Sequence, residues 1–219
     1  TPLTLTPPKA RRRSIDDFGG GDKSAGPAVK VSVQAVILQM AAAKRWGQDQ
    51  YARLDRHTVS MSHPDGTVAL LSGRSEVTAH MSGPPFQNQQ LEDPRVRKVF
   101  SSYDVVGGPA TTNVVWATAK FHDGKPRLYR AFLAALTEAQ EIINRDFKAA
   151  AQLYIRADKS KLAPEFVERI LADPNLRFTV VPENTMKFAD FMHAIGTIKT
   201  KPGSWKDLFF SGIHGQPGS

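Results

Sequence analysis

The sequence contains no cysteine, which excludes disulfide bonds, thiolate metal sites and thiol nucleophiles. It also has no run close to the roughly 18 apolar residues that a membrane-spanning helix needs. No apolar signal segment precedes the region that resembles a mature protein. With 219 residues, of which 41% are hydrophobic, the chain can bury the core of one large domain or two small ones. A globular protein is therefore predicted; if it is exported, its signal is absent from this sequence.

Acidic residues are in the minority, and 21 of them against 29 basic residues give a net charge of +8. Lys9, Arg11, Arg12 and Arg13 supply part of the excess within a segment rich in proline and glycine. A basic tail of this kind can contact nucleic acid or acidic surfaces nonspecifically. The other basic residues are scattered, and no stacking aromatics interleave with them, so no specific nucleic-acid recognition is predicted.

The first 28 residues are poor in apolar groups and rich in turn formers, such as Gly19-Gly20-Gly21 and Gly26-Pro27. Such a segment buries too little apolar surface to offset its ordering entropy. We predict a disordered or loosely packed leader over residues 1–28. An α/β ligand-binding domain is expected over residues 29–118, and a helical part over residues 119–219.

The stretch from residue 65 to residue 86 divides into a short helix, a strand and a stiff loop. The helix opens at Pro64, carries an apolar side over residues 68–71 and ends at Gly73. Alternating apolar and polar residues over 77–82 predict a strand, which runs into a Gly-Pro-Pro loop. Open α/β sheets hold ligands at the carboxyl ends of their strands. The candidate binding residues of this stretch are Ser82, Gly83 and Pro84.

Another helix is predicted from about Gln34, with Val36, Ile37, Met40 and Ala41 on its inner side and Gly47 after its last turn. Ser32 is the expected N-cap. A helix N-terminus presents unpaired N–H groups and the positive end of the helix dipole, which suits an anion. Ser32 and Gln34 are therefore candidate donors to a sulfonate, nitrate or carboxylate oxygen. The alternative is that Ser32 only caps the helix.

Two histidines, His63 and His80, lie near the ends of predicted strands, the first of which covers residues 58–61. Two histidines without a carboxylate or cysteine at coordinating spacing make a poor ligand set, so no metal site is predicted. Hydrogen bonding in the loop layer is their expected role, with His80 the one expected to face a ligand. No nucleophile–base pair is visible, and neither a catalytic residue nor a cofactor is predicted.

The second half of the chain changes from strand-like to helical patterns. A β-branched run over residues 112–118 predicts a buried strand, and Asn113 is a candidate amide donor there unless backbone groups satisfy it. Beyond Pro126 a packed amphipathic helix is expected, with Leu128, Phe132, Leu133, Leu136, Ile142 and Ile143 on its apolar face. Further helices are expected over residues 147–157, 164–172 and 183–195, with a brief strand over residues 178–181.

The ordered series of these segments resembles the periplasmic solute-binding proteins of ABC importers, and most of all their nitrate, taurine and aliphatic-sulfonate class. The resemblance lies in a helix ending in L-x-S-G, the strand E-V-T-A-H and the proline loop. It continues with PAVKVSVQAVILQMAAA before them and with DPRVRKVFSSYDVVGGPATTNVVWATAKF and SWKDLFF after them. It covers roughly residues 14–210, and its specificity lies in the long series rather than in any one motif.

This resemblance implies an α/β fold of the type II periplasmic-binding-protein kind. It implies lobe two together with the C-terminal helices of lobe one, while most of the lobe-one sheet is absent because nothing ahead of Ser14 can supply it. The implied function is that of a noncatalytic bacterial protein of the periplasm, which captures a small anionic solute for the membrane permease of an ABC importer. The implied ligand residues are Ser32, Gln34, His80, Ser82, Gly83, Pro84 and Asn113.

Two departures from the family leave alternatives open. Residues 24–26 read Ser-Ala-Gly where a continuous apolar strand is expected, and the C-terminal helices lack the sheet that they cover in the family. These helices are expected to fold back on the remaining sheet, to pair with another copy in a homo-oligomer, or to leave apolar patches exposed. The alternative functions are a pyrimidine-precursor synthase of thiamine biosynthesis on the same fold, using His63 and His80, and a truncated fragment without ligand affinity.

Overall fold

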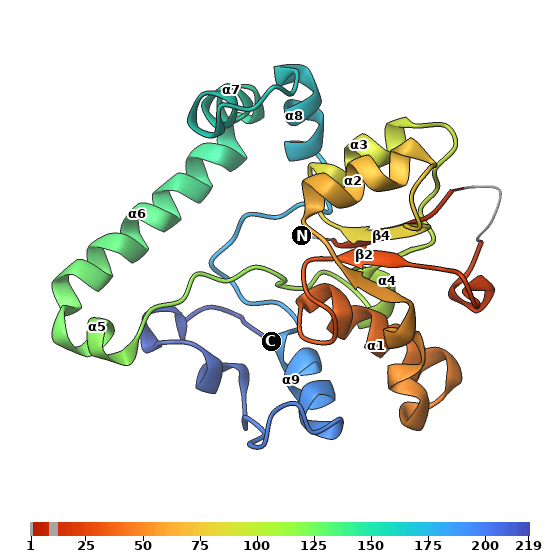
Figure 1. Cartoon of the computed structure of the whole chain (residues 1–219). Coiled ribbons are helices and arrows are strands. Elements are labelled where there is room, and N and C mark those ends of the chain that lie inside the picture. Colours follow the sequence, from red (N-terminus) through yellow and green to blue (C-terminus); the bar gives the residue numbers. More distant parts are fainter. Residues whose placement is uncertain (1, 9–12) are drawn as a thin grey trace. The chain divides into compact units, whose positions relative to one another are not determined.

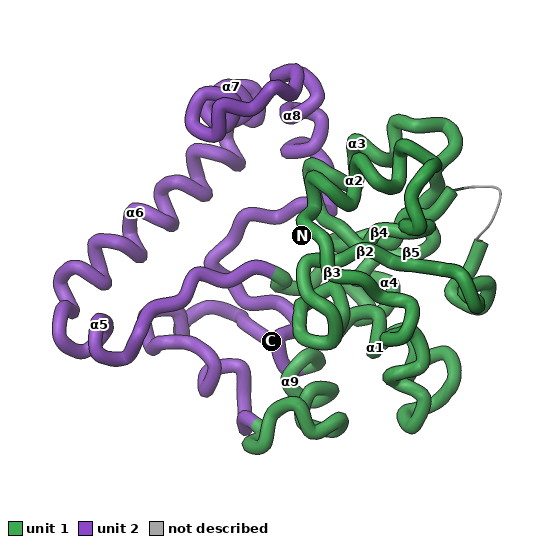
Figure 2. Tube along the Cα trace, in the orientation of Figure 1, with its two compact units in different colours: residues 1–112, 187–201 green, residues 113–186, 202–219 purple. Residues whose placement is uncertain are grey.

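A computed structural model describes residues 2–8 and 13–219 of the chain (Figure 1). The chain divides into two compact units (Figure 2). Unit 1 comprises residues 1–112 and 187–201, and unit 2 comprises residues 113–186 and 202–219. The chain thus passes from unit 1 to unit 2 after residue 112, and residues 187–201 return to unit 1.

Unit 1 is built on a five-stranded sheet with the strand order β3-β2-β4-β1-β5. The strands are β1 (Thr4–Thr6), β2 (Ser24–Gly26), β3 (Thr58–Ser60), β4 (Ala79–Ser82) and β5 (Phe100–Ser101). Strand β2 is parallel to both of its neighbours, whereas β1 is antiparallel to β4 and β5. This open, mixed sheet with helices confirms the predicted α/β class.

The described part of the first 28 residues is well packed, so the prediction of a loose leader is wrong there. Leu3 and Leu5 belong to the core, and all three residues of β1 are buried. Composition alone missed this because β1 is stabilised by β4 and β5, two partners from much later in the chain. The basic residues at positions 9, 11 and 12 lie outside the described residues.

Helices cover both faces of the sheet (Figure 1). Helices α2 (His63–Ser72) and α3 (Phe86–Glu92) lie on one face, and α1 (Val33–Trp46) and α4 (Ser102–Val106) lie on the other. The 3-10 helices η1 (Ile15–Asp17) and η2 (Gln48–His57) and most of α9 (Thr185–Ala194) also belong to unit 1. Glycines in positive-φ conformations follow α1 at Gly47 and α2 at Gly73, as the sequence predicts.

Two apolar clusters form the core of unit 1. The larger one joins Leu5 and Met81 of the sheet to Ile37 of α1, all three without solvent exposure. The smaller one contains Ala25, Leu70, Val77 and Val96. Within the predicted apolar side of α2, Leu70 is buried as expected, but Val68 is 69% exposed. A ten-residue helix turns only one stripe towards the sheet, and Val68 lies outside that stripe.

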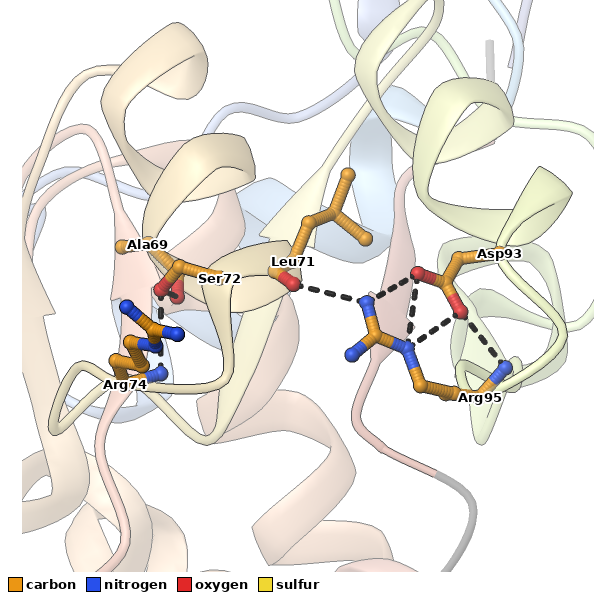
Figure 3. A network of polar contacts seen from close by, with 6 residues as sticks. All are labelled: Ala69, Leu71, Ser72, Arg74, Asp93 and Arg95. Atoms are coloured by element: carbon orange, nitrogen blue, oxygen red, sulfur yellow. Dashed lines mark hydrogen bonds and ion pairs between the residues drawn. The ribbon is translucent and has the colours of Figure 1, made fainter.

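The end of α2 is held by the side chain of Arg95, which follows α3 (Figure 3). Its Nη2 donates to the carbonyl oxygen of Leu71 at 3.0 Å and to Asp93 Oδ2 at 2.6 Å. Hydrogen bonds from Arg95 lower the pKa of Asp93 to about 2. The Leu71 carbonyl oxygen, in the last turn of α2, has no N–H partner within the helix and gains a charged donor. This contact joins the ends of α2 and α3.

Unit 2 consists mainly of helices, as the sequence predicts. Its elements are α5 (Ala119–Gly124), α6 (Pro126–Arg145), α7 (Phe147–Asp158), α8 (Pro164–Leu171), η3 (Trp205–Leu208) and η4 (Ser211–Ile213). Helix α6 has no buried residue, so the prediction that its apolar face is packed is wrong: Leu128, Phe132 and Ile142 are about half exposed. In the described parts of the chain, no helix is long and apolar enough to span a membrane.

The strands predicted over residues 112–118 and 178–181 are not formed. Residues 113–117 carry no regular secondary structure, and Val114, Val115 and Trp116 are 57%, 62% and 81% exposed. High β-propensity describes how well a side chain fits a pleated, half-buried surface. No described strand pairs with either segment. Their β-propensity alone therefore does not produce a strand.

Candidate functional site

A small pocket lies in unit 1 between the first turns of α1 and the strands β2 and β3. Its empty space is about 220 Å³, part of which is open to solvent. Its lining residues are Ser24, Ala25, Gly26, Ala28, Val29, Ser32, Gln34, Ala35, Leu38, Thr58, Val59 and Met81. Most of this lining is apolar, so the few polar groups decide what chemistry the pocket can accept.

The N-terminus of α1 forms one wall of the pocket. Ser32 is the N-cap, as predicted, and its Oγ accepts from the amide of Ala35 at 3.2 Å and donates to the carbonyl oxygen of Ala28 at 2.7 Å. The Ser32 hydroxyl proton is therefore already used. The first-turn N–H groups of Val33 and Gln34 also have no acceptor within the helix, and of these two residues Gln34 lines the pocket. They carry the positive end of the helix dipole.

Ser24 is the polar group that best marks the pocket as a binding site. It lies on β2, is 3% exposed and lines the pocket, yet its Oγ has no hydrogen-bond partner within the protein. Leaving a buried hydroxyl unpaired costs about 1–3 kcal/mol. A ligand atom in the pocket would supply the missing partner.

A chain of polar side chains runs from the pocket into the layer between the sheet and helix α2. Gln34, which lines the pocket, lies with its Nε2 3.2 Å from His63 Nε2. His63 Nδ1 lies 3.1 Å from His80 Nε2. His63 is the first residue of α2, whose N-cap Ser62 accepts from the amide of Asp65. His80 lies in the middle of β4.

The inner end of this chain is Gln90 of α3, which is not exposed at all. Its Nε2 lies 2.7 Å from His80 Nδ1 and donates to Thr67 Oγ1 at 2.8 Å. Its Oε1 accepts from Thr6 Oγ1 at 2.5 Å. The Thr67 hydroxyl in turn donates to the carbonyl oxygen of His63 at 2.9 Å. We call the series Gln34, His63, His80 and Gln90 the relay.

The His80 ring can take this place only because residue 66 is glycine. A Cβ at Gly66 would lie 2.9 Å from both Cε1 and Nε2 of His80, closer than van der Waals contact allows. Burial, with His63 nearby, lowers the pKa of His80 to about 4, and burial lowers the pKa of His63. Both rings are therefore neutral at pH 7. No group of three or more potential metal ligands occurs among the described residues.

The structure brings together some of the predicted ligand residues and separates others. Ser32 and Gln34 line the pocket, and His80 is linked to it through His63. The remaining predictions are Ser82, Gly83 and Pro84, which follow one another at the end of β4 without lining the pocket, and Asn113, an exposed residue of unit 2.

Several residues of the site carried little or no signal in the sequence. Ser24 lay in the segment predicted to be loose, and Gln90 lies in a polar run, Gln87 to Gln90, that gives no reason to single it out. Gly66 did carry a signal, because a glycine inside a helical pattern often marks a close approach. His63 was expected to hydrogen-bond in the loop layer, but nothing in the sequence linked it to Gln34.

The comparisons with known proteins point to one fold. No family model matches the sequence, and neither does any curated protein. Solved structures do match. The periplasmic aliphatic sulphonate binding protein SsuA from Escherichia coli is 16% identical, with a TM-score of 0.62 over 91% of this chain. The alkanesulfonate-binding protein SsuA from Xanthomonas axonopodis pv. citri is 17% identical, with a TM-score of 0.66 over 88% of it.

The chain has the fold of a periplasmic solute-binding protein. A third neighbour, the ligand-binding component of an ABC-type import system from Staphylococcus aureus, is 13% identical, with a TM-score of 0.65 over 94% of this chain and 67% of its own. The predicted resemblance is thereby confirmed at the level of the fold. The chain spans 62% and 64% of the two sulfonate-binding proteins, less than two thirds of their length.

Proposed function

We propose that this protein is the substrate-binding component of an ABC importer, located in the periplasm, and that it captures a small anion of the sulfonate, taurine or nitrate kind for a membrane permease. Binding and release are its whole chemistry in this proposal, without a catalytic step. The observation that carries it is Ser24, a residue that lines a pocket beside a helix N-terminus and whose buried Oγ has no hydrogen-bond partner within the protein.

The groups around this pocket favour an oxygen-rich anion. Ser24 can donate its hydroxyl proton, and the first turn of α1 adds N–H groups together with the positive end of a fourteen-residue helix. No carboxylate side chain lines the pocket to repel an anion or to attract a cation.

The size of the pocket limits how much of the solute it can hold. The empty space of about 220 Å³ includes space open to solvent, so the enclosed part is far smaller than the roughly 300–1,000 Å³ of sites for drug-sized ligands. Its apolar lining, which includes Leu38, Val59 and Met81, would contact any short hydrocarbon portion.

A ligand series tests the proposal. Taurine, alkanesulfonates, nitrate, bicarbonate and thiamine-pyrimidine precursors are titrated into the protein, and binding is read from the rise in melting temperature and from calorimetry. We expect a concentration-dependent rise for sulfonates or nitrate. A cooperative melt that no compound shifts would contradict the proposal.

A matched pair of serine variants ties binding to the pocket. Ser24→Ala removes one hydrogen bond to a charged ligand, which should weaken the Kd roughly 10–100-fold. Ser72→Ala is the control, because Ser72 is exposed at the far end of α2 and its hydroxyl serves only the local turn. Equal affinity of the Ser24→Ala variant and the wild type would exclude this pocket as the binding site.

A further inference from the structure

The relay contains a proton-ordering problem. An amide nitrogen only donates hydrogen bonds, and each neutral imidazole has one donor nitrogen and one acceptor nitrogen. Both ends of the relay present an amide Nε2 to a histidine nitrogen, at 3.2 Å for Gln34 and at 2.7 Å for Gln90. If His80 donates to His63, the outer nitrogen of His80 accepts and the outer nitrogen of His63 donates; if His63 donates to His80, the roles are reversed. In either case only one of the two outer nitrogens can accept from an amide. One of the two amides must therefore turn its oxygen towards the histidines.

The surroundings of Gln90 decide which amide turns. On one side the Gln90 amide meets two groups, His80 Nδ1 and Thr67 Oγ1, and on the other side it meets only Thr6 Oγ1. An NH2 group has two protons to give, so it suits the side with two partners. Turning Gln90 over would leave one buried N–H without a partner, at a cost of about 1–3 kcal/mol.

The contact with Thr6 fits this orientation, because the Thr6 hydroxyl donates to the Gln90 oxygen. The Gln90 oxygen therefore faces Thr6, and its NH2 faces His80 and Thr67.

We propose that Gln90, acting through His80 and His63, fixes the Gln34 amide with its oxygen towards His63 and its NH2 towards the pocket. The order follows step by step. Gln90 donates to His80 Nδ1, so His80 carries its proton on Nε2 and donates to His63 Nδ1. His63 then carries its proton on Nε2 and donates to the Gln34 oxygen. The Gln34 NH2 is left to face the pocket.

The consequence is a pocket in which the Gln34 amide acts as a donor. The Gln34 NH2 joins the Ser24 hydroxyl and the first-turn amides of α1, and the relay withholds the Gln34 oxygen from the ligand. This inference rests on the proposed function and sharpens it: the pocket selects a group that offers only acceptor oxygens, such as a sulfonate or nitrate. Gln90 and the two histidines are positioning residues and contact no solute.

The proton order can be measured without any ligand. In protein labelled with ¹⁵N-histidine, two-bond nitrogen–proton correlations identify which ring nitrogen carries the proton. We expect Nε2–H in both His63 and His80 at pH 7. A proton on Nδ1 of either ring would overturn the relay, whatever the protein binds.

A variant of Gln90 then connects the proton order to binding. Gln90→Met keeps the side-chain length, and Thr6 and Thr67 retain the carbonyl oxygens of His80 and His63 as acceptors. We expect mixed histidine tautomers and a Kd for methanesulfonate raised roughly threefold to tenfold, the worth of one misdirected hydrogen bond. The control is Gln89→Met, a neighbouring position on α3 outside the relay, which should leave both readouts unchanged.

The outcomes separate this inference from the proposed function. If the wild type binds neither methanesulfonate nor nitrate, the proposed function fails, while the tautomers still decide the proton order. If the wild type binds and Gln90→Met weakens binding with both rings still Nε2–H, the relay is refuted because the effect does not pass through the histidines.

Discussion

Acidification should destabilise unit 1 because of the buried ring of His80. Its pKa is about 4 in the folded protein, against about 6.5 in an unfolded chain. Between these values the unfolded state binds more protons, so the free energy of unfolding falls as the pH falls. Each pH unit in this window costs about 1.4 kcal/mol, or about 3 kcal/mol in total. His63 adds a contribution of the same sign, because its pKa is lowered too.

The assay is urea unfolding at pH 7.0 and pH 4.5, followed through NMR signals of β1 and β4 so that unit 1 is read by itself. We expect the wild type to lose about 2–3 kcal/mol between the two conditions. His80→Gln, which removes the titrating ring, should lose much less. His193→Gln, a change at an exposed histidine of unit 1, should behave like the wild type. A stability that is flat from pH 7.0 to 4.5, or an equal loss in His80→Gln, would refute the reasoning.

Three further changes test the supports of the site. Gly66→Ala should destabilise unit 1 by about 1–2 kcal/mol in urea unfolding, because overpacking against the His80 ring outweighs the better helix propensity of alanine. Ser62→Ala removes the N-cap that starts α2, and should cost about 1 kcal/mol by the same measurement. Arg95→Lys loses the forked contact that reaches both Asp93 and the Leu71 carbonyl oxygen, and should speed amide hydrogen exchange in the last turn of α2.

Each of these changes has a control within the chain. Gly20→Ala places a methyl group where no atom lies within 4 Å and should be close to neutral. Ser72→Ala alters a serine at the other end of α2. Arg74→Lys is the control for Arg95, because Arg74 follows the same end of α2 and donates to Ser72 Oγ through its backbone amide (Figure 3). If a control variant changed stability or hydrogen exchange as much as the variant it is paired with, the contact assigned to that variant would not be the cause of the change.

The fold was predictable from sequence wherever local signals decide the structure. Ser32 as the N-cap of α1, Gly73 after α2 and the helices beyond Pro126 all rest on caps, breakers and periodicity. Signals of this kind do not predict a strand whose formation depends on pairing with a segment distant in the sequence. Strand β1 forms because β4 and β5 flank it, and residues 112–118 do not form a strand because no described strand pairs with them.

The start of α1 could be singled out from the sequence, but the contacts between the side chains behind it could not. Strand-to-helix order alone points to the start of α1 and therefore to Ser32 and Gln34. The link from Gln34 to Gln90 joins three helices through the central strand β4, and no spacing in the sequence encodes such a path. His80 was expected to face a ligand, but as a central-strand residue it is buried on both sides, with each ring nitrogen already in a contact.

The return of residues 187–201 to unit 1 affects the order in which the protein can be completed during synthesis. Phe188 packs against the larger core cluster, and Lys187 Nζ donates to the carbonyl oxygen of Val106 at 2.8 Å. A ribosome adds about 5–20 residues per second, so these groups are made roughly 4–15 s after residue 112. During that interval the part of the larger core cluster that Phe188 contacts in the complete fold lacks this cover.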